Sequence, residues 1–346
     1  MSLRIRFHLL FLSLFTAALP GVVYAQPNIV LIMADDMGWG DIAMNGNPFS
    51  INTPNLEKIA RSGARFEHFM VSPLCAPTRA SLLTGRYHLR TGVSNVTGGL
   101  ETMRSEEVTM AEVFRNAGYA TGLFGKWHNG AHYPQDPNGQ GFDEFFGFCG
   151  GHWTNYFNTR LQHNQTMVAT RGYITDVLTD AALDFIEKNK ARPFLCYIPY
   201  NAPHGPFQVD DKYFNKFKSK GVNDMDAAIY GMVENVDENI GRVLEKLESL
   251  KLTGNTIVVF LTDNGPNSNR YNGYMKGKKG AVDEGGCTGT VVYSLAGKDQ
   301  GRNGRKTTRR PHRPAPHTCG VEQYYVSPYA AVGWKKPRAP AAWQDR

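Results

Sequence analysis

Cysteine is scarce in this chain, with five residues among 346. The five are too scattered for a disulfide framework, and they include no closely spaced pair of the kind that holds zinc. Long apolar runs are also rare, so we expect no membrane span. One apolar run stands at the start of the chain, behind two arginines and ahead of Val23-Tyr24-Ala25. It predicts a secretory signal peptide over residues 1–25, and therefore an extracytoplasmic location, whether periplasmic, secreted or lysosome-like.

An excess of positive charge is missing from most of the chain, although the formal net charge is +7. Residues 287–346 hold eleven Lys or Arg against three Asp or Glu, whereas the first 286 residues hold 27 basic and 28 acidic groups. The charge therefore gives no indication of nucleic-acid binding by the main body. The basic segment also has six prolines and no apolar periodicity. We expect residues 287–346 to form a largely irregular tail.

The body of the chain, residues 26–286, alternates between strand and helix patterns. Continuous apolar runs at Asn28–Met33 and Thr256–Leu261 suit buried parallel strands. Between them the apolar pattern predicts further elements, among them a helix over Ile174–Asn189. The succession predicts one α/β domain with a mostly parallel central sheet flanked by helices.

Oxygen-bearing side chains follow two of the predicted strands. Asp35 and Asp36 come soon after the first strand, and Asp263 and Asn264 follow the strand that ends at Leu261. Each pair alone could equally be a turn or a helix cap. Because ligands gather at the carboxyl ends of parallel strands, we expect the two pairs to lie close together. Three carboxylates and one amide suit Ca²⁺ or Mg²⁺ rather than zinc.

A cysteine opens the stretch Cys75-Ala76-Pro77-Thr78-Arg79-Ala80-Ser81-Leu82-Leu83-Thr84-Gly85-Arg86. Proline is tolerated early in a helix, so Cys75 is predicted just outside a helix N-terminus. Free N–H groups and the helix dipole favour an anion at that point, and Arg79 could face the same anion. For a bare Cys-x-Pro, a buried cysteine before a short helix would be the simpler interpretation.

Four more cationic or titratable side chains stand in predicted loops. Lys126 and His128 follow a strand that ends at Phe124, and His204 lies in the proline-flanked stretch Asn201-Ala202-Pro203-His204-Gly205-Pro206. Lys279 stands five residues before Glu284-Gly285-Gly286, with Lys276 and Lys278 as nearby competitors. Taken one at a time, each of these side chains could be an ordinary solvated loop residue.

Together these stretches resemble the sulfatase family, the formylglycine-dependent, arylsulfatase-like enzymes of the alkaline phosphatase superfamily. The string that starts at Cys75 is similar to the family signature, in which the cysteine is oxidised after translation to formylglycine. The resemblance extends from about Pro27 to Gly286, with the motifs in the expected order. It implies hydrolysis of a sulfate monoester, aryl or carbohydrate, and a formylglycine-generating enzyme as a partner during maturation.

The resemblance also implies a role for each candidate residue. The metal, Ca²⁺ or alternatively Mg²⁺, would be held by residue 75 and by the four oxygen-bearing residues, Asp35, Asp36, Asp263 and Asn264. The sulfate oxygens would be bound by Arg79, Lys126 and Lys279. His204 would lie beside the leaving-group oxygen. Hydrated formylglycine would attack sulfur, and His128 would then deprotonate its second hydroxyl so that sulfate is expelled.

Two departures from the family pattern stand out. His128 is followed by Asn129-Gly130, where the family usually has Leu-Gly. After Gly286 the family continues with Val-Arg-x-Pro and a smaller antiparallel subdomain, whereas this chain has Cys287-Thr288-Gly289-Thr290. We therefore expect the family's C-terminal subdomain to be missing or replaced. Two alternatives stay open: a related formylglycine phosphonate or phosphodiester hydrolase, and a secreted, non-catalytic sulfatase remnant.

Overall fold

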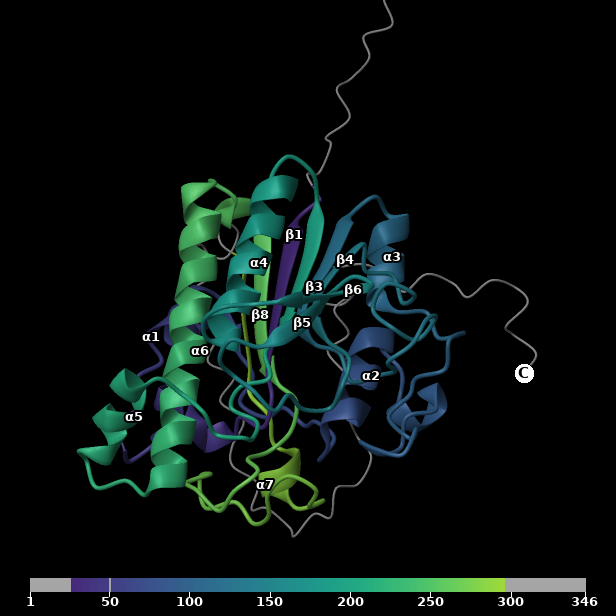
Figure 1. The fold of residues 1–346 in the computed structure, drawn as a ribbon. Coiled ribbons are helices and arrows are strands. Elements are labelled where there is room, and N and C mark those ends of the chain that lie inside the picture. Colours follow the sequence, from purple (N-terminus) through teal and green to yellow (C-terminus); the bar gives the residue numbers. More distant parts are fainter. Residues whose placement is uncertain (1–25, 50, 296–346) are drawn as a thin grey trace, which may run out of the picture.

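The computed structural model describes residues 26–49 and 51–295 (Figure 1). The predicted signal peptide and residues 296–346 of the predicted tail lie outside this range. Within it, nine strands form one sheet in the order β2-β9-β8-β1-β7-β3-β4-β5-β6.

The five central strands of the sheet are parallel, as predicted. They are β8 (Thr256–Thr262), β1 (Asn28–Ala34), β7 (Phe194–Pro199), β3 (Ala120–Lys126) and β4 (Glu144–Phe148). Two antiparallel strands flank them on each side: β9 (Val291–Leu295) and β2 (Ala64–Arg65) on one, β5 (Arg160–His163) and β6 (Thr166–Ala169) on the other. The mostly parallel α/β sheet is thus confirmed.

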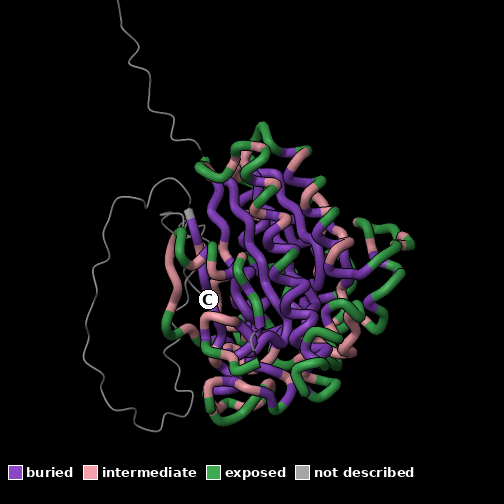
Figure 2. The backbone as a smooth tube through the Cα atoms, turned by 90° about the vertical axis from the view of Figure 1, so that its left-hand side faces the viewer, coloured by how far each residue is buried: buried purple, intermediate pink, exposed green. Residues whose placement is uncertain are grey.

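Helices cover both faces of this sheet (Figure 1). One face carries α1 (Pro54–Ser62), α4 (Ile174–Asn189) and α6 (Asp224–Ser249), and the other carries α2 (Cys75–Thr84) and α3 (Met110–Asn116). The short α5 (Asp211–Lys218) packs against α6. Alternate residues of β1 enter the two apolar cores, because successive side chains of a strand point to opposite faces. The central strands are therefore buried on both sides, as Figure 2 shows.

The folded body extends past the predicted boundary at Gly286. Gly286 falls inside the short helix α7 (Glu284–Cys287), and the chain then continues into β9. This strand pairs antiparallel with β8 and, over two residues, with β2. Residues 287–295 therefore belong to the folded body. The β-forming side chains of β9 favour a strand, but the basic, proline-rich composition of residues 287–346 as a whole predicts an irregular segment.

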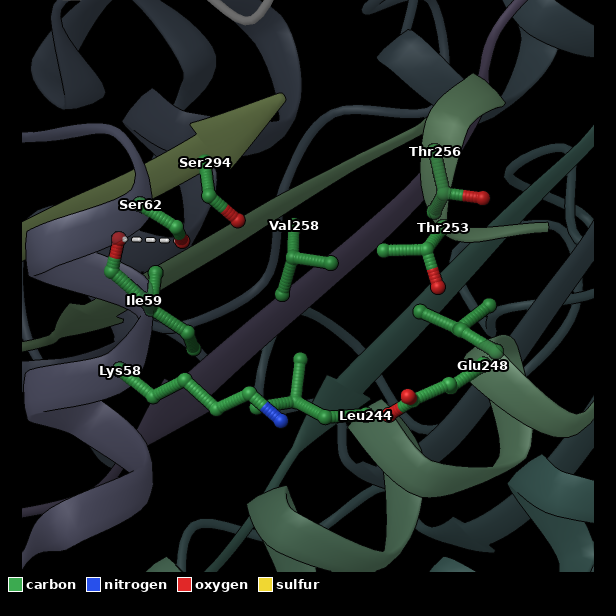
Figure 3. A pocket seen from close by; sticks show the side chains of 10 residues that line it. Lys58, Ile59, Ser62, Leu244, Glu248, Thr253, Thr256, Val258 and Ser294 are labelled. Atoms are coloured by element: carbon green, nitrogen blue, oxygen red, sulfur yellow. Dashed lines mark hydrogen bonds between the residues drawn. The ribbon is translucent and has the colours of Figure 1, made fainter. Parts of the chain in front are cut away.

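A cavity of about 320 Å³ lies between α1, α6 and the amino end of β8 (Figure 3). Thr256, which lines it, begins β8, whereas Asp263 follows the other end of that strand. None of the residues lining this cavity is among the candidate site residues. The helices of the described ranges include none that is long and apolar enough to cross a bilayer.

The place of β9 in the sheet can be tested with two valines. Val292 is fully buried in β9, whereas Val282 is 61% exposed in the loop before α7. We expect Val292→Asp to lower the free energy of unfolding by about 3 kcal/mol or more, because it buries an unpaired charge. Val282→Asp should change it by less than about 0.5 kcal/mol. Urea denaturation compares the two, and equal midpoints would contradict an integral β9.

Candidate active site

The candidate residues meet at the carboxyl edge of the parallel strands. They come from the ends of four of those strands, from one helix and from one loop: Asp35 and Asp36 after β1, Lys126 and His128 at and after β3, His204 after β7, Asp263 and Asn264 after β8, Cys75 and Arg79 on α2, and Lys279 in the loop between β8 and α7. Parallel strands present their carboxyl ends at one edge, so the order of the sheet brings these side chains together.

Cys75 is the first residue of α2, one position further into the helix than the sequence predicts. Its side chain is 1% exposed. The sulfur lies within 4.8 Å of carboxylate oxygens of both Asp35 and Asp263. Burial raises the pKa of the Cys75 thiol to about 11, so at neutral pH the unmodified side chain is a protonated thiol rather than a thiolate nucleophile.

Two buried cations hold the Asp35 side chain. Lys126 Nζ lies 2.5 Å from Asp35 Oδ2, and Arg79 Nη2 lies 3.8 Å from Asp35 Oδ1. Burial disfavours the charged form of Asp35, but the charges of Lys126, His204 and Arg79 outweigh it and hold its pKa below the usual range. Arg79 also donates to Asp263 Oδ2 at 2.8 Å and to the Lys126 carbonyl at 3.2 Å.

Asp36 contacts a second group of side chains. Lys279 Nζ lies 2.7 and 2.9 Å from its two carboxylate oxygens, and His204 Nε2 lies 3.6 Å from Oδ2. The Asn264 amide donates to Asp36 Oδ1 at 2.8 Å. His204 Nδ1 lies 2.7 Å from the Gly205 carbonyl and so carries a proton, and Nε2 faces Asp36.

His128 is held with one ring nitrogen free. Its Nε2 donates to the Val96 carbonyl at 2.9 Å, whereas the buried Nδ1 has no hydrogen-bond partner. Burial, followed by the charge of Lys126, lowers the pKa of His128 to about 3. The ring is therefore neutral at physiological pH, and Nδ1 is a proton acceptor.

The donor set fits a divalent cation. Asp35 Oδ1 and Asn264 Oδ1 are buried oxygens without a hydrogen-bond partner. Burial and the nearby charge of Asp35 raise the pKa of Asp263 to about 7, despite its contact with Arg79. Several carboxylates thus share one buried space, and their oxygens are the ligands that Ca²⁺ and Mg²⁺ prefer.

Two polar residues near Asp36 escaped the sequence analysis. Asn267 donates to Asp36 Oδ2 at 3.0 Å, and Arg270 donates to the Asp36 main-chain carbonyl at 2.8 Å. Both lie in the polar run that follows the strand-end motif Asp263-Asn264-Gly265, which is the signal that could have pointed to them. His152, whose sequence position matches a polar site position of some sulfatases only loosely, stacks parallel to His204 with ring centroids 6.4 Å apart.

Comparison with known proteins identifies the class. The Sulfatase family model matches residues 27–312, and the chain belongs to this family. N-acetylgalactosamine-6-sulfatase of Sus scrofa is 34% identical over 293 residues, which cover 75% of this chain and 54% of that protein. Uncharacterized sulfatase YdeN of Escherichia coli (strain K12) is 29% identical over 334 residues, covering 80% and 59%.

Solved structures agree with this assignment. The crystal structure of Ps i-CgsB in complex with k-i-k-neocarrahexaose has a TM-score of 0.74 and 33% identity, and covers 78% of this chain and 66% of that one. The phosphonate monoester hydrolase of Agrobacterium radiobacter, at 20% identity and a TM-score of 0.58, shares the fold. The chain spans about half the length of the curated relatives it matches.

The carboxylate cluster predicts that a divalent cation stabilises the protein. At a Ca²⁺ concentration 100 times its dissociation constant, we expect about 2.7 kcal/mol of added stability. Asp263→Asn should remove most of this gain, because it deletes one charged ligand. Asp184→Asn, an exposed change on α4, should keep it. Thermal unfolding in Ca²⁺ and in EDTA measures the effect, and an equal Ca²⁺ response in both variants would contradict the assignment.

The lowered pKa of His128 predicts acid sensitivity. Between pH 6.5 and about 3 the unfolded chain binds a proton that folded His128 does not, so the free energy of unfolding falls as the pH falls through this window. The contribution of this residue is on the order of 4 kcal/mol at the acid end. His128→Gln should remove that part of the pH dependence, whereas the exposed His132→Gln should retain it. Chemical denaturation at stepped pH gives both slopes, and identical slopes would contradict the prediction.

Proposed function

We propose that this protein hydrolyses sulfate monoesters, either aryl or carbohydrate sulfates, after a formylglycine-generating enzyme has oxidised Cys75. The observation that supports this most directly is the position of Cys75, whose sulfur lies within 4.8 Å of the carboxylates of Asp35 and Asp263. A buried, protonated thiol at that point is a poor nucleophile, but an oxidised side chain there would lie among metal ligands and cations. Membership of the sulfatase family supports the same chemistry.

The proposed metal site consists of residue 75 and the four oxygen-bearing residues, Asp35, Asp36, Asp263 and Asn264. Ca²⁺ is the expected ion, with Mg²⁺ as the alternative. When bound, the cation would supply positive charge that stabilises anionic oxygens and favours deprotonation of a hydroxyl beside it. The formylglycine, once formed and hydrated, would supply two hydroxyls on one carbon.

The side chains around position 75 then divide the remaining work. Lys126, Lys279 and Arg79 are cations that would bind and orient the sulfate oxygens and offset the charge that develops on them. His128 is neutral, with Nδ1 free, so it can accept a proton from a hydroxyl at position 75. When its ring is doubly protonated, His204 could deliver the Nε2 proton to the departing alcohol oxygen, while Nδ1–H stays bonded to the Gly205 carbonyl.

Names of similar proteins and the N-terminal sequence bear on the substrate class and on the location of this protein. Ps i-CgsB was solved with a neocarrahexaose, and the mammalian relatives are named for N-acetylgalactosamine 6-sulfate. These names favour a sulfated sugar over a simple aryl sulfate as the natural substrate of this chain. The arginine-led apolar run before residue 26 supports export from the cytoplasm.

Replacement of Cys75 tests the proposed reaction. We expect Cys75→Ala to lower kcat for 4-nitrocatechol sulfate by at least about 10³-fold, because no other side chain can supply the paired hydroxyls. Cys75→Ser should accumulate a sulfated serine, since one hydroxyl can accept sulfate but the release step is absent. Cys149→Ala, another free cysteine, should retain activity. Peptide mass spectrometry at position 75 measures the conversion to formylglycine and the sulfated serine.

Three outcomes separate this proposal from its rivals. Normal turnover by Cys75→Ala would sink the formylglycine mechanism. Faster turnover of aryl phosphonates or phosphate diesters than of aryl sulfates would favour the related hydrolase. A protein that is converted at Cys75 but inactive on every sulfate ester would favour a non-catalytic remnant.

A further inference from the structure

A fully buried ion pair lies beside the candidate active site and has no role in the reaction described above. Arg270, in the loop between β8 and α7, contacts Asp41, the last residue of the 3-10 turn η1 (Trp39–Asp41) after β1. Both side chains are 0% exposed. Taking two charges out of water costs several kcal/mol per ion in proteins. An apolar pair of similar volume would often stabilise the fold at least as much as the buried ion pair does. The other contacts of the pair therefore indicate what it does.

Every N–H group of the Arg270 guanidinium has an acceptor. Nε and Nη2 donate to the two carboxylate oxygens of Asp41 at 2.7 and 2.6 Å, and Nη2 also donates to the Asp36 carbonyl at 2.8 Å. Nη1 donates to Asn267 Oδ1 at 3.1 Å and to Ser268 Oγ at 2.9 Å. These are the five donors of a planar, rigid group, and a lysine cannot reproduce their arrangement.

Asp36 needs such support because its backbone is in the left-handed region, with φ of 63°. A residue with a side chain is disfavoured there unless the surrounding contacts hold it. Arg270 anchors the Asp36 carbonyl directly. It also holds Asn267 Oδ1, so that Asn267 Nδ2 faces the Asp36 carboxylate at 3.0 Å. Asp41 Oδ2 accepts the Gly38 N–H at 2.7 Å and fixes the turn that follows Asp36.

We propose that Arg270 and Asp41 are a positioning pair that sets the orientation of Asp36 for metal binding. The inference rests on the proposed function, in which Asp36 is a metal ligand and also contacts Lys279 and His204. Arg270 acts on both parts of Asp36, through the main-chain carbonyl and, by way of Asn267, through the carboxylate. Loss of a group that orients a metal ligand typically costs 10- to 100-fold in metal affinity.

Arg270→Lys tests this directly, because it keeps the positive charge and removes the fork of donors. We expect the Ca²⁺ dissociation constant, measured on the full chain by isothermal titration calorimetry, to rise 10- to 100-fold. Compared with wild type, the melting temperature of Arg270→Lys should fall far less in EDTA than in Ca²⁺, when both proteins are measured at the same Ca²⁺ concentration. Arg242→Lys is the matched control, since Arg242 bonds an asparagine, Asn239, and an aspartate, Asp180, on helices away from the site. It should leave Ca²⁺ affinity unchanged.

The outcomes distinguish the inference from the proposed function. A folded Arg270→Lys protein with wild-type Ca²⁺ affinity would overturn the inference, even if its melting temperature in EDTA were lower. If Arg270→Lys does not fold, Asn267→Ala should weaken Ca²⁺ binding in the same direction, and wild-type affinity in that variant would overturn the inference instead. A wild-type protein that binds neither Ca²⁺ nor Mg²⁺ would overturn the metal site of the proposed function and the positioning role with it.

Discussion

The candidate active site depends on the burial of opposite charges at one edge of a sheet. Three carboxylates and three cations share this edge: Asp35, Asp36, Asp263, Arg79, Lys126 and Lys279. An unpaired charge in such a place would cost several kcal/mol, so each group depends on partners from other elements. The consequence is that β1, β3, β8, α2 and the loop after β8 must all be in place before any one of these side chains is stable there.

The apolar cores fix the strands whose ends carry these charged side chains. The central strands contribute to two separate cores, one under α1, α4 and α6 and the other under α2 and α3. Packing on both faces leaves a strand little freedom to shift in register, because a slip of one residue would exchange its two faces. The side chains that follow each strand therefore emerge at set positions. Chemistry is confined to the ends of elements, and stability comes from their interiors.

Two histidines illustrate how the surroundings of a residue decide its role. His128 is buried beside Lys126 and donates Nε2–H to the Val96 carbonyl, so it is neutral with a free acceptor. His204 instead donates through Nδ1 to the Gly205 carbonyl and directs Nε2 at Asp36. The surroundings thus place the proton on Nε2 in His128 and on Nδ1 in His204.

Much of this molecule followed from local sequence. Apolar periodicity and strand-end motifs are local signals. They predict the strands that begin at Asn28 and Thr256, the helix Ile174–Asn189 and the oxygen-bearing side chains that follow the two strands. Strands β5 and β6 were missed because each has only four residues, too few to show a clear period. Strand β9 was missed because it is short and stands directly before a basic, proline-rich segment, whose composition dominates that of residues 287–346.

The sequence by itself determined which residues were available for chemistry and which segments would be strands or helices. Only the tertiary structure decided that the Cys75 thiol is buried against two carboxylates, that Lys279 pairs with Asp36, and that Arg270 reaches back across more than two hundred residues to the Asp36 carbonyl. These contacts join segments far apart in the chain, and no periodicity or spacing encodes them. They exist because the parallel order of the sheet brings β1 and β8 side by side.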